Sequence, residues 1–506
     1  MPERVVLGSL VMVLQLALLL GTAPVAAQTI DGRGVDRQAG DRALTPAQAL
    51  EDFDVLRRGL EETHAGLYRY SGKPDLDRRF DSLRARLERP MHRLAFIGVV
   101  SEMLAEIRCG HTRLEYDDST NAAMARARQF PLGVAIEGSR LVVVSNDTPG
   151  DTTIRPGMEV LRINGRAAAD VLDVLLPKLP GDGFIKTGKR VQLGRRFGQY
   201  YWLFVDQAAE FLVTARDADG PAVTTRLTGV VTAERARNAN GNPANARMLE
   251  NAARLEGSRE NVALRFVSGP NIAHLRVRAF GGETYPDQIE TAFRTLRDSG
   301  TAALILDLRG NGGGVDLYGA QLVSQFTDRP FRYFDRIRVT TIHPSFATWR
   351  PSTFEDLREG TVADSAGGYL VSPRLHGGVA ERPPSRLPFL GRVVVLLDGG
   401  TFSTAADVTA VLHNMGRATF VGEESGGGYY GNTSGLNALI VLPHSRLRLR
   451  IPMYGYWNAV SAGEQGRGTR PDHAVDRRTA DVLRGVDEQW ERALALARGA
   501  AARQPD

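Results

Sequence analysis

The sequence predicts an α/β fold that carries a helical segment at its N-terminal side and a β-rich insert before the α/β core. Helical spacing of apolar residues marks the first segment, and short apolar runs separated by turn residues mark the insert. Beyond residue 260 strands alternate with helices, which is typical of an α/β core. The chain has 506 residues, 42% hydrophobic and 24% charged, so it is long enough for several globular domains.

Residues 1–27 read as a secretory signal. Arg4 precedes an apolar run over residues 5–20, and small residues follow up to Ala27. The alternative is a retained membrane anchor, but the run is shorter than the roughly 20 residues that cross a bilayer. We therefore expect cleavage near Ala27, a periplasmic or secreted protein, and no membrane span in the mature chain. Cys109 is the single cysteine, so no internal disulfide can form.

The charge pattern gives no sign of a nucleic-acid partner. The net charge of +5 comes from 63 basic and 58 acidic residues that are spread along the chain rather than clustered. Lysine is rare, and none follows residue 189; the lysines are Lys73, Lys178, Lys186 and Lys189.

Three regions follow the signal. Residues 45–128 are predicted as a helical domain, since Leu60, His64 and Leu67 share one helical spacing. Residues 129–230 contain the motif Ile-Arg-Pro-Gly-Met-Glu-Val-Leu-Arg-Ile-Asn-Gly at 154–165, which resembles the signature of PDZ domains. That resemblance implies a module that receives a peptide by strand addition. The alternative is a plain β-hairpin with an Asn-Gly turn.

Residues 232–259 are predicted as a linker or exposed helix, and residues 260–485 as the α/β core. The core elements expected from periodicity are strands at 272–277, 303–308, 392–397 and 418–421 and helices at 286–298 and 404–415.

A turn in this core places Ser403 at the start of a helix. The strand at 392–397 runs into Asp-Gly-Gly-Thr-Phe-Ser-Thr at 398–404, and the amphipathic helix begins at once. Unpaired N–H groups and the helix dipole favour an anion there, as a nucleophile and its oxyanion require. A plain N-cap serine is the equal alternative.

A second turn, Arg-Gly-Asn-Gly-Gly-Gly at 309–314, follows the strand at 303–308. Its glycines let backbone N–H groups approach a ligand closely. A dinucleotide or phosphate loop is disfavoured, because Val315 occupies the last glycine position and no lysine follows. Donation to an oxyanion is the better use of this loop.

Together the two turns resemble the tail-specific, or C-terminal processing, serine peptidase superfamily, which also contains the tricorn core and the interphotoreceptor retinoid-binding protein. The resemblance rests on residues 306–314, 401–403, 416–418 and 421–423, with support from 63–68 and from the PDZ-like insert. It implies a crotonase-like α/β peptidase core, a peptide or protein substrate, and no metal or organic cofactor.

One branch of the superfamily uses a lysine base about 25 residues after the serine, where this chain has Gly428. The tricorn-like branch instead takes its histidine from a Gly-His-Thr setting, which here is His111. A histidine base predicts activity that falls as the pH drops through roughly 6–7. His413 and His473 are poorer bases by position, and Cys109 is expected to be a buried structural thiol rather than a nucleophile or ligand.

The resemblance places the orienting acid in a loop just before a Gly-x-x-Pro-Asp motif. Counting back from Pro471 gives Gln465, with Glu464 one residue away. Glu464 is our choice, and Glu423 and Glu424 are its rivals.

The sequence therefore predicts an exported serine peptidase that acts on peptide or protein C-termini. Ser403 attacks, His111 accepts the proton, Glu464 orients His111, and the N–H groups of Gly313 and Thr404 bind the oxyanion. The alternative is an inactive peptide- or ligand-binding protein on the same scaffold.

Overall fold

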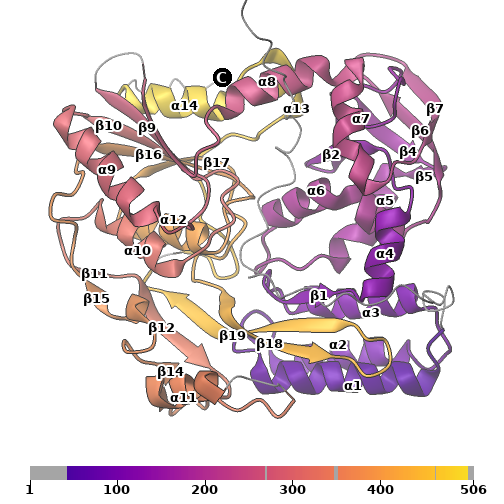
Figure 1. Ribbon diagram of the computed structural model, residues 1–506, viewed down its shortest axis with the longest axis horizontal. Coiled ribbons are helices and arrows are strands. Elements are labelled where there is room, and N and C mark those ends of the chain that lie inside the picture. Colours follow the sequence, from indigo (N-terminus) through magenta and orange to yellow (C-terminus); the bar gives the residue numbers. More distant parts are fainter. Residues whose placement is uncertain (1–42, 268–270, 347–350, 462, 500–506) are drawn as a thin grey trace, which may run out of the picture.

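The computed structural model describes residues 43–267, 271–346, 351–461 and 463–499. The predicted signal at 1–27 lies outside these residues. Figure 1 shows the central parallel sheet and its helices on one side and the sheet of the β-rich insert on the other, with the N-terminal helices and a further sheet below. Among the described residues no helix has the length and apolar character needed to cross a membrane. The domain boundaries expected from the sequence stay a prediction.

The central sheet has the strand order β20-β17-β16-β10-β9-β8. Its strands are mutually parallel except for β8, which pairs antiparallel with β9 at one edge. Continuous apolar runs are typical of strands that are buried on both faces, and β10 and most of β16 are buried. The strands are β8 (Val262–Phe266), β9 (Ile272–Val277), β10 (Ala303–Asp307), β16 (Arg392–Leu397), β17 (Thr419–Gly422) and β20 (His473–Ala474).

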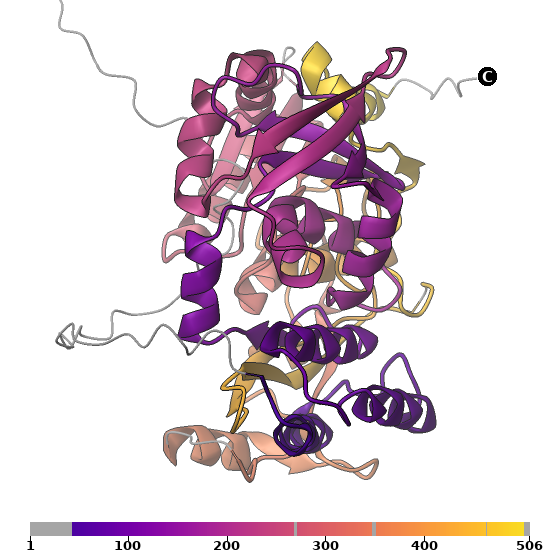
Figure 2. The ribbon, with the colours of Figure 1, turned by 90° about the vertical axis from the view of Figure 1, so that its right-hand side faces the viewer.

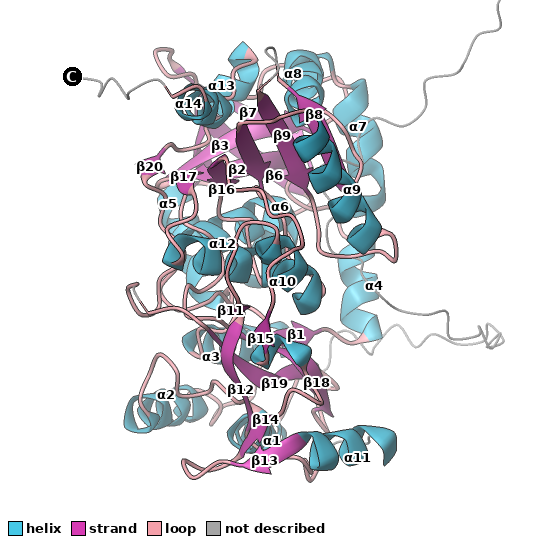
Figure 3. Cartoon of the chain, turned by 90° about the vertical axis from the view of Figure 1, so that its left-hand side faces the viewer, coloured by secondary structure: helices cyan, strands magenta, loops and turns pink. Residues whose placement is uncertain are grey.

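Helices cover both faces of the central sheet, as Figure 3 shows. On one face lie α9 (Tyr285–Asp298), α10 (Asp316–Ser324) and α12 (Thr404–Asn414), and their side chains join the largest apolar core. On the other face α14 (Glu488–Ala497) packs against β10 and β16 through Ala493 and Leu494. The strands and helices expected for this core match these bounds to within a residue or two.

The N-terminal helices pack against a second sheet that the sequence analysis did not predict. Helices α1 (Pro46–Thr63), α2 (Lys73–Ala85) and α3 (Arg93–Glu106) share one apolar core with strands β18 (Thr433–Val441) and β19 (Arg448–Asn458). Asp52 of α1 accepts hydrogen bonds from the N–H groups of His444 and Ser445 in the β18–β19 turn. The remaining strands of this sheet are β1 (Arg113–Glu115), β12 (Phe334–Val339), β13 (Thr361–Ala363) and β14 (Tyr369–Val371).

The β-rich insert forms its own sheet and its own core. The strand order is β2-β3-β4-β6-β7, with the short β5 against β4, and Figure 2 shows this sheet from its outer side. At the centre of its core Phe130 stacks on Tyr201 and packs edge-to-face against Phe197 and Phe211. Its elements are β2 (Leu132–Glu137), β3 (Arg140–Asn146), β4 (Glu159–Ile163), β5 (Arg166–Ala167), α5 (Ala168–Leu175), α6 (Thr187–Phe204), β6 (Glu210–Arg216) and β7 (Ala222–Thr228).

The segment at 232–259 is mainly helical, with α7 (Arg235–Gly241) and α8 (Ala246–Glu256). Arg235 ties α7 to the insert through an ion pair with the buried Asp147 at 2.7 Å. The segment therefore matches the helical alternative of the prediction, and it packs on the insert. The other elements are α4 (Asp118–Arg126), β11 (Phe331–Arg332), α11 (Pro351–Gly360), β15 (Glu381–Arg382) and α13 (Thr479–Arg484).

Candidate active site

The two glycine-rich turns follow adjacent parallel strands, β10 and β16, so they meet at the same edge of the central sheet. Asp398 Oδ1 accepts the N–H of Gly310 at 2.8 Å, and Phe402 donates its N–H to the carbonyl of Asn311 at 2.9 Å. Thr401 Oγ1 donates to the carbonyl of Leu308 at 2.9 Å. These bonds lock the two turns into one unit.

Ser403 has an unusual backbone conformation. Its φ of 55° and ψ of −132° lie where residues with a side chain are rare, and such strain clusters at functional sites. The residue occupies the N-cap position of α12, but its side chain makes no capping hydrogen bond. The half-buried hydroxyl is therefore free for another partner, which disfavours the plain N-cap interpretation.

That partner is His111. Its Nε2 lies 3.1 Å from Ser403 Oγ, within hydrogen-bond reach of a nucleophile. The imidazole stacks on Phe402, with 4.6 Å between ring centroids and 24° between planes. A Cβ on Gly110 would come within 2.7 Å of the Phe402 ring, so the close approach requires glycine at that position. The sequence prediction that Ser403 and His111 come together matches this geometry.

The loop that carries His111 lies between α3 and β1 and is supported from α1. His64, at the C-cap of α1, accepts the N–H of Gly66 at Nδ1, so its Nε2 carries the hydrogen and donates to Thr112 Oγ1 at 2.9 Å. Burial lowers the pKa of His64 to about 3, so this histidine stays neutral and acts as a structural support.

The other ring nitrogen of His111 is buried, and Nδ1 has no hydrogen-bond partner within the described part of the chain. Burial, with a smaller contribution from the positive charge of Arg113, lowers the pKa of His111 to about 3. The neutral imidazole, which can accept a proton, is thus the resting form at neutral pH. The expectation that His111 itself titrates at pH 6–7 does not fit this environment.

The two predicted oxyanion donors differ in availability. The Gly313 N–H already donates to Asn311 Oδ1 at 2.9 Å, so it is not free as the sequence analysis expected. A Cβ on Gly313 would lie 2.6 Å from Ser403 Cβ and 3.0 Å from the Thr404 nitrogen, so the glycine is needed for space. Thr404 is the first residue of α12, and N–H groups in the first turn have no intrahelical partner. Thr404 is therefore the better-placed donor.

The structure does not bring the predicted acid to His111. Glu464 is exposed and pairs with Arg470 at 2.5 Å, and Gln465 is exposed as well. Its rivals also have other partners: Glu423 accepts the N–H of Arg477, and Glu424 holds Arg467 at 2.7 Å. Glu464 and Gln465 lie in the chain between β17 and β20, and the pairing of these two strands does not fix where the side chains between them point. Counting residues back from Pro471 therefore could not predict which side chain points towards His111.

The remaining candidate bases and nucleophiles are also placed. His413 bonds to the Tyr429 hydroxyl and His473 to Arg492. All four lysines lie in the described residues, and none hydrogen-bonds to Ser403. Cys109 is buried, its Sγ donates to the carbonyl of Thr433 at 3.3 Å, and burial raises its thiol pKa to about 11. It is therefore a structural thiol.

One buried carboxylate next to His111 was missed by the sequence analysis. Ligand atoms of Cys109, His111 and Asp182 lie within 4.8 Å of one another, close enough to surround a metal ion. A thiol that stays protonated is a poor metal ligand, so this cluster does not favour a metal. Asp182 sits between two glycines in a polar turn of the insert, and nothing in its local sequence relates it to a site 71 residues earlier.

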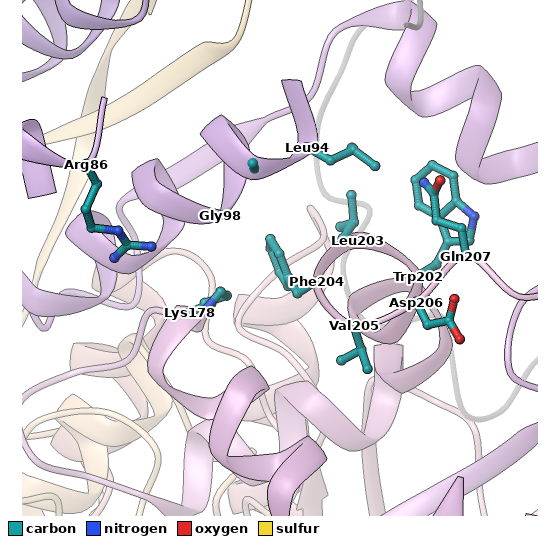
Figure 4. A pocket seen from close by; sticks show the side chains of 11 residues that line it. Arg86, Leu94, Gly98, Lys178, Trp202, Leu203, Phe204, Val205, Asp206 and Gln207 are labelled. Carbon is teal, nitrogen blue, oxygen red and sulfur yellow. The ribbon is translucent and has the colours of Figure 1, made fainter. Parts of the chain in front are cut away.

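One cavity of the molecule lies apart from Ser403 and His111. A cavity of about 560 Å³ lies between α3 and α6, and Figure 4 shows Leu94, Lys178 and Phe204 around it. Neither Ser403 nor His111 lines it. The site is therefore identified by its side-chain geometry, and this cavity has no part in it.

Comparison with known proteins agrees with the geometry. Residues 271–475 match the model of peptidase family S41. The α/β core of this chain is therefore similar to peptidase family S41. The match confirms the resemblance to the tail-specific serine peptidases, and it covers both glycine-rich turns and Ser403 of the S41 core. No curated protein matches the chain.

Solved structures show a similar fold. Mature CPAF is 16% identical with a TM-score of 0.62, covering 90% of this chain and 97% of its own. CPAF in complex with lactacystin gives the same identity and TM-score and is covered over 98% of its length. A putative peptidase from Parabacteroides merdae is 16% identical at a TM-score of 0.43, covering 91% of this chain and 100% of its own. The predicted α/β peptidase fold is confirmed.

Proposed function

We propose that the chain is an exported serine peptidase in which Ser403 is the nucleophile and His111 the general base. The observation that carries the proposal is the 3.1 Å approach of His111 Nε2 to a serine with a φ of 55°. His111 takes the Ser403 proton as Oγ attacks a peptide carbonyl, and later gives it to the leaving amine. Thr404 N–H, at the positive end of α12, stabilises the oxyanion. Glu464 as the third member stays a prediction.

We propose that the PDZ-like insert recognises the carboxyl terminus of the peptide substrate. Support comes from the PDZ-like motif and from contact between the insert and the core. Thr187 at the start of α6 donates to the carbonyl of Glu424 at 2.9 Å, and a Cβ on Gly188 would lie 3.2 Å from Gly426. A peptide held on the insert would thus end near the loops around Ser403. Export rests on the sequence of residues 1–27.

The test is labelling of the purified protein with a fluorophosphonate probe, together with hydrolysis of peptides that differ only in a free or an amidated C-terminus. Labelling that Ser403→Ala abolishes, with faster cleavage of the free-acid peptides, is expected. If the folded protein is not labelled at Ser403, the alternative of an inactive binding protein is favoured instead. Equal cleavage of both peptides would contradict recognition of the carboxyl terminus but would still support peptidase activity.

A further inference from the structure

Two buried polar atoms on the neighbouring side chains of His111 and Asp182 each lack a hydrogen bond within the described residues. They are His111 Nδ1 and Asp182 Oδ2, neither of which has a partner in the part of the chain that the structure describes. One ring nitrogen of His111 and one carboxylate oxygen of Asp182 lie within 4.8 Å. Buried polar groups are almost always satisfied, so two such atoms on side chains this close together call for an explanation.

The backbone holds Asp182 firmly at this place. Its Oδ1 accepts the N–H of Gly110, the residue before His111, at 2.7 Å. The next residue, Gly183, donates its own N–H to the carbonyl of Arg108 at 2.9 Å. Gly183 also has a φ of 55°, and a Cβ there would come within 2.3 Å of the Gly466 carbonyl. The turn from the insert is therefore clamped onto the loop that carries His111.

The chemistry of the base requires a partner at Nδ1. His111 accepts the serine proton at Nε2 only if Nδ1 carries the ring hydrogen, and a carboxylate at Nδ1 fixes that tautomer. We propose that Asp182 is the residue that positions His111 and balances the imidazolium, in place of the predicted Glu464. This inference rests on the proposed function. The two side chains reach hydrogen-bond distance by a small tightening on substrate binding, which is common for catalytic hydrogen bonds.

The protons balance in this arrangement. The Ser403 O–H proton moves to His111 Nε2 as the new C–O bond forms, Nδ1–H donates to the Asp182 carboxylate once substrate is bound, and Nε2–H passes to the leaving nitrogen. Asp182 gains no proton at any step. Its carboxylate offsets the positive charge on the ring only while that charge exists, so it lowers the barrier more than it strengthens substrate binding.

The surroundings of His111 and Asp182 determine how activity depends on pH. Burial raises the pKa of Asp182 to about 6, against the N–H groups of Gly110 and Gly428 and the positive charge of Arg69. The neighbouring Cys109 stays a neutral thiol, and Arg113 disfavours imidazolium. Above pH 6 the pair is carboxylate plus neutral imidazole, which is the active form. As the pH falls through 6 the pair takes up a proton and activity is lost.

The decisive variant is Asp182→Asn, which keeps an oxygen for the Gly110 N–H but presents an amide to His111. We expect kcat to fall by roughly 10²–10⁴-fold with little change in KM. The acid limb of kcat/KM should move from about pH 6 to below pH 5, because only His111, with its low pKa, then titrates. Asp182→Glu should recover part of kcat and restore the limb.

Asp52→Asn is the matched control. Asp52 is fully buried and accepts two backbone N–H groups, at 2.9 Å and 2.7 Å, far from Ser403 in the chain. That variant should leave the acid limb near pH 6 even if its melting temperature falls. A merely structural role for Asp182 would give the same pattern as Asp52→Asn, a loss of stability with an unmoved limb, and would overturn the proposal. So would a kcat within threefold of wild type.

An activity-independent readout separates this proposal from the proposed function. Selective ¹⁵N labelling of histidine, with His111→Gln to assign its signals, reports the ring tautomer by NMR. We expect the Nδ1–H tautomer in the wild type, with a shift near pH 6 that Asp182→Asn removes. The Nε2–H tautomer in the wild type would overturn the role of Asp182 whether or not the protein cleaves peptides. If the expected tautomer is observed but fluorophosphonate does not label Ser403, the proposed peptidase activity is contradicted and the positioning of His111 by Asp182 is not.

Discussion

His111 Nε2 and Ser403 Oγ lie 3.1 Å apart although 292 residues separate them in the chain. One residue is on a loop after α3 of the N-terminal helices, and the other is at the first turn of α12 in the S41 core. The Phe402 ring fills the space beneath the imidazole and fixes its plane. The pair therefore forms only when the N-terminal helices are docked on the core.

Removal of the nucleophile gives the first prediction. Ser403→Ala is expected to lower peptide hydrolysis by about 10⁶-fold, because no other side chain at the site can form the acyl intermediate. The melting temperature should stay close to that of the wild type. The measurement is kcat/KM on one peptide with a circular dichroism melt on the same sample. Hydrolysis at the wild-type rate by the folded variant would rule out Ser403.

The strained backbone gives a second prediction. Ser403→Gly should be more stable than Ser403→Ala by about 1–3 kcal/mol, since glycine adopts a φ of 55° without a steric penalty. Both variants lack the hydroxyl, so the comparison isolates the backbone. The free energy of unfolding from urea titration measures it. Equal stabilities would show that this conformation stores no strain.

Space beside the nucleophile gives a third prediction. Gly313→Ala would place a Cβ 2.6 Å from Ser403 Cβ, so we expect kcat to fall by at least a hundredfold. Gly310→Ala is the matched control: its φ of 71° carries the same kind of backbone strain, but nothing lies within 4 Å of its Cβ. A comparable loss of kcat in both variants, measured on one peptide, would attribute the effect to backbone strain rather than to crowding of Ser403.

The predicted acid can be tested directly. Because Glu464 is exposed and paired with Arg470, Glu464→Gln is expected to change kcat by less than about threefold, and Gln465→Glu should not raise it. These two variants are measured beside Asp182→Asn on one substrate. A hundredfold loss in Glu464→Gln would restore that glutamate as the third member and require its loop to move towards His111.

The cluster of Cys109, His111 and Asp182 makes metal dependence testable. We expect no loss of activity after incubation with EDTA, because the Cys109 thiol, with a pKa raised by burial to about 11, stays protonated and ligates weakly. The assay compares kcat before and after chelation and then with added zinc. Activity that EDTA removes and zinc restores would mean that this cluster holds a metal.

Local sequence patterns predicted the central strands well, because β10 and β16 are apolar runs bounded by Gly-rich turns. They did not predict β18 and β19. Much of β18 alternates between buried and half-exposed positions and includes glycine and asparagine, which weaken a strand signal. That hairpin gains its stability from contact with α1, a contact between residues hundreds of positions apart.

The sequence by itself determined which residues can do chemistry: a serine at a strand-to-helix turn, a glycine loop after the neighbouring strand, a histidine between two small or polar residues, and no late lysine. Adjacent parallel strands then bring the two turns together by the ordinary rules of α/β sheets. Only the tertiary structure decided which carboxylate lies behind the histidine. Glu464 has the favourable position in sequence but faces solvent, whereas Asp182 arrives from the insert through a turn clamped onto the His111 loop. The direction of a loop side chain depends on packing between distant segments, and residue spacing carries no record of that packing.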